Sequence, residues 1–175
     1  MTGAVAAVVL AALLALAASP AAASERIRVA IVDSARSVEL RGADIEVTEL
    51  GAPCLACAVL PRRTAAVRAT VSAGAVEIDG VRAPGGFRLQ SDKPVRFNGR
   101  EYPAPLDIVR NGDGLALVNE LPLEEYLVGV LRAESSEKWS LEALCAQAIV
   151  ARTYAAYQCT LAVGKPYHII ASTAH

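Results

Sequence analysis

Apolar and polar residues alternate along the first half of the chain with the two-residue period of half-buried β-strands. The alternation is clear at residues 27–31, 38–41 and 76–78. Turn sequences separate such stretches: Gly80, Pro84-Gly85-Gly86, Asn98-Gly99 and Asn111-Gly112-Asp113-Gly114. The pattern predicts a β-rich part over residues 24–117. Asn98-Gly99 is expected to join strands 95–97 and 100–102 into a hairpin.

The spacing becomes helical after Leu121, where Leu123, Tyr126, Leu127, Val130 and Leu131 recur every three to four residues. Pro122 suits the first turn of this helix, and the helix dipole favours the charges of Glu124 and Glu125 there. A second helix is expected from the N-cap Ser140 to about Leu161. The fold class is therefore α+β, with a β-rich part followed by a helical core over residues 118–175.

Arg152 is the most informative basic residue of the second helix. On a helical projection it falls on the stripe of Leu141, Cys145 and Ala148. A guanidinium on a core-facing stripe keeps its charge and needs a carboxylate or carbonyl partner. The sequence therefore predicts a carboxylate or a set of carbonyl groups as the partner of Arg152.

The amino terminus has the pattern of a signal peptide. Residues 4–18 are apolar and residues 19–23 are small, which predicts a leader over 1–23 with cleavage after Ala23 or close to it. A membrane anchor is the alternative, but the apolar run is shorter than the roughly 20 residues of a spanning helix. We expect an exported protein of the periplasm or cell envelope.

Composition limits which partners the protein is expected to bind and which chemistry its cysteines are expected to have. A net charge of −1 offers no basic surface for nucleic acid. In an exported protein, Cys54 and Cys57 are expected to form a local disulfide or remain buried thiols, in preference to a redox or metal half-site. Cys145 and Cys159 lie fourteen residues apart in one predicted helix, about 21 Å of rise, so they cannot bond to each other.

Glu134 lies between the two predicted helices, beside Val130, Leu131 and Trp139. Partial removal of water would keep its carboxyl protonated near neutral pH, as a general acid requires. The alternative is an ordinary exposed or salt-bridged glutamate. Position alone favours that alternative, because most carboxylates are not catalytic.

A resemblance to a known family strengthens the catalytic interpretation of Glu134. Residues 119–131, Glu134, Trp139 and residues 141–154 follow one another in the order and spacing of the SpoIID/LytB family. The resemblance spans about Leu106 to the end of the chain. It implies a protein of the bacterial envelope that acts on peptidoglycan glycan strands, either as a lytic transglycosylase or as a non-catalytic enhancer of a wall amidase.

The resemblance also implies site residues. The family's catalytic acid follows a Gly-Val-Leu segment and matches Glu134, and an arginine in its Ala-Arg-Thr-Tyr segment matches Arg152. We therefore expect these two side chains to lie close together. Gln147, Tyr154, Ser172 and Thr173 are the expected substrate-binding residues. A lytic transglycosylase closes the C6 hydroxyl of the sugar onto its own C1, so one carboxylic acid is enough, whereas most glycosidases use two.

Three departures bear on activity. Cys145 stands where many members have lysine, and the zinc-binding cysteines that some members carry are missing from residues 167–175. His168 and His175 are two residues without a third candidate ligand, so no cofactor is expected. The family pattern also continues beyond Ser172 and Thr173, so the core is expected to be incomplete. An active enzyme, an enhancer and a truncated remnant all remain open.

Overall fold

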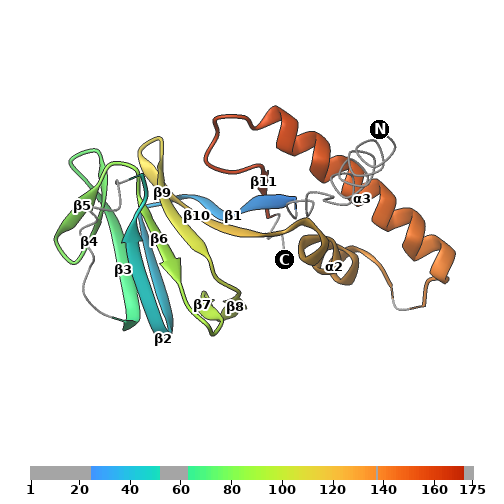
Figure 1. Ribbon diagram of the computed structural model, residues 1–175, viewed down its shortest axis with the longest axis horizontal. Coiled ribbons are helices and arrows are strands. Elements are labelled where there is room, and N and C mark those ends of the chain that lie inside the picture. Colours follow the sequence, from blue (N-terminus) through green and yellow to red (C-terminus); the bar gives the residue numbers. More distant parts are fainter. Residues whose placement is uncertain (1–24, 52–62, 137, 172–175) are drawn as a thin grey trace, which may run out of the picture.

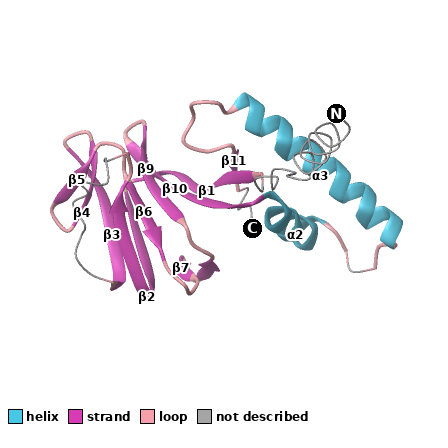
Figure 2. Cartoon of the chain, viewed as in Figure 1, coloured by secondary structure: helices cyan, strands magenta, loops and turns pink. Residues whose placement is uncertain are grey.

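A computed structural model describes residues 25–51, 63–136 and 138–171, and within them the chain forms one large mixed sheet with two helices. Figures 1 and 2 show a β-rich end, a helical end, and a long two-stranded ribbon that joins them. This arrangement confirms the α+β class. The strands are β1 (Arg26–Ala35), β2 (Ser37–Glu49), β3 (Thr64–Ser72), β4 (Ala75–Ile78), β5 (Val81–Ala83), β6 (Phe87–Gln90), β7 (Val95–Phe97), β8 (Arg100–Tyr102), β9 (Leu106–Asn111), β10 (Gly114–Pro122) and β11 (Ile169–Ile170); the helices are α2 (Leu123–Glu134) and α3 (Leu141–Leu161).

The sheet has the order β11-β1-β10-β9-β6-β2-β3-β4-β5, and the β7–β8 hairpin attaches to β2. Its largest core lies at the β-rich end, where Leu40, Ile45, Phe87 and Leu89 are completely buried. Val38 and Leu40 of β2 point inward while Glu39 and Arg41 are exposed, as the alternation predicts. Apolar burial on one face thus fixes the register of this strand.

The predicted hairpin is confirmed. Strands β7 and β8 are antiparallel, with Val95 opposite Tyr102 and Phe97 opposite Arg100. Asn98 and Gly99 both have positive φ, 46° and 80°, as a two-residue type I′ turn requires. Asparagine and glycine are the residues that adopt this conformation most readily, so the turn follows from the sequence.

The expected division between residues 117 and 118 falls inside a strand. β10 runs through it, pairs along its length with β1 and β9, and leads directly into α2. At the other edge of β1, Val29 pairs with Ile169 of β11 in parallel. The β-rich part and the helical part therefore share one sheet.

The two helices pack on the far end of the β1–β10 ribbon. Leu123 and Leu127 of α2 and Ala155 of α3 are buried there against Ile27 and Val29. Helix α3 begins as predicted, because the Oγ atom of Ser140 accepts a hydrogen bond from the backbone N–H of Ala143 at 3.3 Å. Pro122 lies one residue before α2, at its N-cap.

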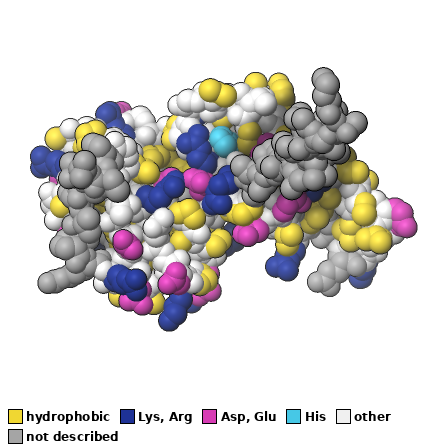
Figure 3. Space-filling view, viewed as in Figure 1, with side chains coloured by type: hydrophobic (Ala, Val, Ile, Leu, Met, Phe, Trp, Pro, Cys, Tyr) yellow, Lys and Arg dark blue, Asp and Glu magenta, His cyan; other side chains and the backbone are white. Residues whose placement is uncertain are grey.

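The predicted core-facing stripe of α3 is wrong. Leu141 is 71% exposed, and Cys145 and Arg152 are exposed as well. The inward side of the helix instead carries Ala151, Ala155 and Cys159. Apolar residues lie on several sides of α3, so spacing alone does not single out the buried one. Figure 3 shows the exposed hydrophobic side chains at this helical end.

Cys145 and Cys159 of α3 are free thiols, so they do not bond to each other, as the helix geometry predicts. The Cys54-Cys57 pair and the expected leader lie outside the described residues. Within the described part of the chain, the structure contains no helix long and apolar enough to span a membrane.

Candidate functional site

A groove of about 640 Å³ separates the β7–β8 hairpin from α2 and contains Glu134. Strands β1, β10 and β11 form its base, and Tyr154 of α3 lies on its wall. Its lining includes Tyr102, Asn119, Glu125, Tyr126, Gly129, Ala133, Glu134 and Tyr154. Polar and aromatic side chains therefore converge on one cavity.

The amphipathic pattern of α2 sets which residues face the groove. Leu123 and Leu127 are buried against the β1–β10 ribbon. This anchoring turns Tyr126, Gly129 and Ala133, at three- and four-residue spacing, toward the groove. The last residue of the helix, Glu134, lies at the end of this face.

Glu134 is held from the second helix. Its Oε2 atom accepts a hydrogen bond from Nε2 of Gln147, at 3.2 Å. Both residues were predicted for the site, and the structure brings them together. The Glu134 side chain is nevertheless exposed, so the expected shielding by Val130, Leu131 and Trp139 is not present. Trp139 is itself 44% exposed, because it lies in the open turn before α3.

Two phenols accompany Glu134 in the groove. Tyr126 is half-buried, and its burial together with the negative charge of Glu134 raises the pKa of its hydroxyl. Tyr154, one of the predicted binding residues, is 55% exposed and lines the same cavity. Neutral tyrosines of this kind present a flat apolar ring and a hydroxyl donor.

Arg152 is placed differently from the prediction. Its Nη2 atom lies 2.5 Å from Oε2 of Glu124, and both side chains are largely exposed. Glu124 and Glu134 are ten residues apart, about 15 Å along α2. The expected contact between Arg152 and Glu134 is therefore wrong. Arg152 does pair with a carboxylate, one of the two kinds of partner expected for it, but the carboxylate lies at the other end of α2 and the pair is exposed instead of core-facing.

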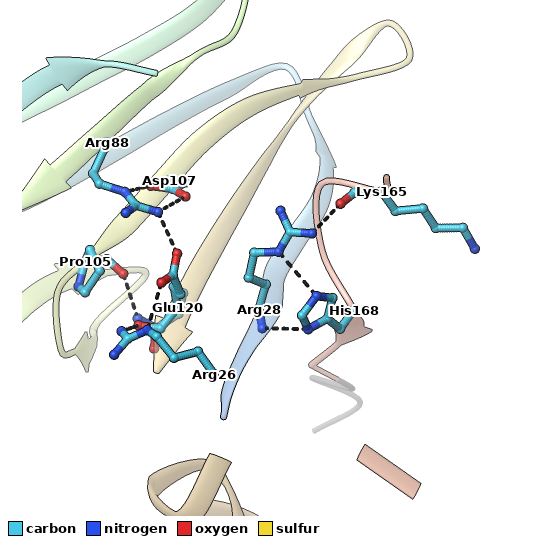
Figure 4. Close-up of polar contacts among 9 residues, drawn as sticks. Arg26, Arg28, Arg88, Pro105, Asp107, Glu120, Lys165 and His168 are labelled. Atoms are coloured by element: carbon cyan, nitrogen blue, oxygen red, sulfur yellow. Dashed lines mark hydrogen bonds and ion pairs between the residues drawn. The ribbon is translucent and has the colours of Figure 1, made fainter. Parts of the chain in front are cut away.

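Arg88, Asp107 and Glu120 line a second cavity, of about 450 Å³, and form a chain of ion pairs with Arg26 (Figure 4). Arg88 of β6 binds Asp107 of β9 through two contacts of 2.8 Å and binds Glu120 of β10 at 2.6 Å. Arg26 completes the chain at 2.8 Å from Glu120. The hydrogen bonds that Arg88 donates to Asp107 raise the pKa of its guanidinium, which keeps it charged. These side chains satisfy one another across neighbouring strands, and we assign them a structural role.

His168 has a structural environment too. Its Nδ1 atom accepts a hydrogen bond from the backbone N–H of Arg28 and lies 3.2 Å from Sγ of Cys159. Burial, followed by the charge of Arg28, lowers the pKa of this imidazole. No group of three potential metal ligands occurs among the described residues. Ser172, Thr173 and His175 lie outside them.

Sequence reasoning missed the part of the groove that comes from the β-rich half. Arg100, Glu101 and Tyr102 line the cavity, although no candidate site residue was predicted in that half. The hairpin itself was predictable from Asn98-Gly99. Its position opposite α2 in the groove was not predictable, because that position depends on the path of β9 and β10 between the two elements.

Comparison with protein families finds a match in the C-terminal part of the chain. The family model SpoIID, described as Stage II sporulation protein, matches residues 111–175. An uncharacterized protein of Brachyspira hyodysenteriae is 43% identical over 72 residues, which is 41% of this chain and 20% of that protein. The chain thus covers well under two thirds of this relative. No solved structure matches the chain significantly.

The predicted resemblance is confirmed over this segment, because residues 111–175 match the SpoIID family model. The groove contains residues from both sides of the family boundary, since Glu134 and Tyr154 lie within the matched segment and Tyr102 lies before it.

Proposed function

We propose that this protein is a peptidoglycan lytic transglycosylase and that Glu134 is its general acid. The observation that carries the proposal is the position of Glu134. It lies at the end of the α2 face in a 640 Å³ groove, hydrogen-bonded to Gln147 and accompanied by Tyr126 and Tyr154. The SpoIID match of the same segment supports a glycan substrate.

The reaction needs one proton donor and no external nucleophile. Glu134 gives its proton to the oxygen that leaves C1 of N-acetylmuramic acid. The C6 hydroxyl of the same sugar then bonds to C1, and its proton passes to the Glu134 carboxylate. The product carries a 1,6-anhydro ring, and the enzyme returns to its starting state. One carboxyl group that acts first as acid and then as base is therefore sufficient.

The open groove is consistent with a polymeric substrate. A glycan strand that fills it displaces water from around Glu134, where the proton transfer takes place. The tyrosine rings offer flat surfaces to the apolar faces of the sugars. The substrate is extracytoplasmic, so the proposal includes export with removal of residues 1–23, which amino-terminal sequencing of the envelope form tests.

The Glu134→Gln variant tests the catalytic role. Glutamine keeps the shape and hydrogen-bonding capacity of the side chain but does not transfer the proton, so cleavage falls by about 10²–10⁴-fold. Glu125→Gln is the matched control, because Glu125 is an exposed glutamate on the same helix and groove. Purified glycan strands are digested, and 1,6-anhydro-N-acetylmuramic acid ends are counted by mass spectrometry. Equal activity of Glu134→Gln and the parent contradicts the assignment.

A non-catalytic amidase enhancer is the second candidate. The exposed apolar residues of α3 favour it, since Leu141, Ile149 and Val150 are each more than 60% exposed and offer a surface to a partner protein. An enhancer stimulates a wall amidase and makes no new sugar ends. If the parent makes no anhydro products and Glu134→Gln still stimulates the amidase, the enhancer assignment replaces the enzyme assignment.

A further inference from the structure

The β7–β8 hairpin forms the wall of the groove opposite α2. Tyr102, at the end of β8, is half-buried. It packs on the main core and pairs with the fully buried Val95, while it also lines the groove. One side of the side chain is thus anchored in the core and another faces the cavity. The hairpin precedes the segment that the SpoIID model matches.

Hydrogen bonds fix the place of Tyr102 relative to α2. Asn119 of β10 is 5% exposed, and its Nδ2 atom donates to the carbonyl oxygens of Pro103 at 2.7 Å and Pro105 at 3.1 Å. Pro103 directly follows Tyr102, Pro105 is two residues further on, and α2 begins four residues after Asn119. A buried amide therefore ties the segment after Tyr102 to β10, the strand that leads into α2.

Gly129 is the second unusual feature of the groove. It lies in the middle of α2, where glycine costs about 1 kcal/mol relative to alanine. Its φ is not positive, and a Cβ atom built on it would meet nothing within 4 Å. Neither backbone conformation nor packing of the described residues requires glycine here. Close approach of a ligand to the helix is one physical reason for a glycine in such an open position.

We propose that Tyr102 and Gly129 form a sugar subsite next to the catalytic position, an inference that rests on the proposed function. The ring of Tyr102 packs against the apolar face of an uncharged N-acetylated pyranose, and the missing side chain at Gly129 lets that sugar lie against α2. Gly129 precedes Glu134 by five residues, about 7.5 Å along the helix.

Binding is measured in the Glu134→Gln background, where no cleavage interferes. The probe is purified, peptide-free glycan strands titrated by calorimetry into the full chain. Tyr102→Leu keeps the core contact but loses the aromatic face, and it weakens binding about two- to tenfold. Tyr102→Phe retains the parent affinity. The matched control is Tyr157→Leu on α3, an exposed tyrosine outside the groove.

Gly129→Ala separates ligand binding from folding. The added methyl group raises the melting temperature, because alanine favours the helix and has room in the protein, yet it weakens glycan binding. Parent-like affinity in both Tyr102→Leu and Gly129→Ala overturns the subsite, as does absence of glycan binding in the Glu134→Gln protein. If the parent protein makes no anhydro ends but the Glu134→Gln protein still binds glycan through Tyr102, the subsite is supported. In that case only the transglycosylase assignment is contradicted.

Discussion

Among single residues, Gln147 has the clearest supporting role. It lies on α3, thirteen residues after Glu134, and its amide reaches across to the Glu134 carboxyl at the end of α2. An exposed glutamate has many rotamers, and one hydrogen bond from a neighbouring helix reduces their number. We therefore regard Gln147 as a positioning residue for the proposed general acid.

Gln147→Ala is expected to lower kcat by about tenfold, the effect of one hydrogen bond to an ionisable group, and to leave KM nearly unchanged. The rate of anhydro-product formation at several glycan concentrations measures both constants. Gln158→Ala, further along α3, is the control. A rise in KM at constant kcat would mean that Gln147 binds substrate instead of orienting Glu134.

Single residues also show how much of the candidate site could be predicted from the sequence. Glu134, Gln147 and Tyr154 were identified through the family resemblance, and all three line or support one groove. The partner of Arg152 was misassigned because a helix with apolar residues on several sides does not reveal its buried face. Only the packing of Ala151 and Ala155 on Leu123 and Leu127 settles that rotation.

At the scale of elements, two polar contacts connect α2 and α3 near their ends. Arg152 binds Glu124 at the start of α2, and Gln147 binds Glu134 at its end. The buried contact between them is small and formed largely by alanine on the α3 side. Element boundaries here followed from local signals, such as the cap at Ser140 and the Asn98-Gly99 turn. The groove between the elements required the long-range pairing of β1 with β10.

The Arg152–Glu124 pair is expected to contribute little to stability. Both side chains are largely exposed, so a double-mutant cycle of Arg152→Ala and Glu124→Ala should give a coupling energy of about 0.2–1 kcal/mol in urea unfolding. If Arg152→Ala alone abolishes glycan cleavage while Glu124→Ala does not, Arg152 acts on the substrate. Equal loss in both variants indicates a role in placing the helices.

At the scale of the whole molecule, the ion pairs around Glu120 join the β-rich end to the helical end. Arg88 and Asp107 belong to β6 and β9, while Glu120 and Arg26 belong to the β10–β1 ribbon that carries the helices. Burial raises the pKa of Glu120, but the hydrogen bonds and charges of Arg88 and Arg26 outweigh it, and the pKa is lowered overall. The ionised form of Glu120 therefore stabilises the fold.

This shift gives a pH dependence with a definite sign. A carboxyl group whose pKa is lower in the folded state contributes stability above its unfolded value of about 4.5, and loses it as the pH falls through the folded pKa. Glu120→Gln should reduce the free energy of unfolding by about 2 kcal/mol at pH 7, with a difference from the parent that shrinks below pH 4.5. Urea unfolding across this range, with the exposed Glu125→Gln as control, measures it. A constant difference would exclude the ionised Glu120 as the cause.

The most direct test of the central claim is cleavage of purified glycan strands by the parent protein in water enriched in heavy oxygen. Intramolecular attack by the C6 hydroxyl predicts 1,6-anhydro-N-acetylmuramic acid ends that contain no heavy oxygen, because no water enters the bond. Reducing ends that carry heavy oxygen would show hydrolysis and require a second catalytic group. Intact strands would contradict the assignment of Glu134 as a general acid altogether.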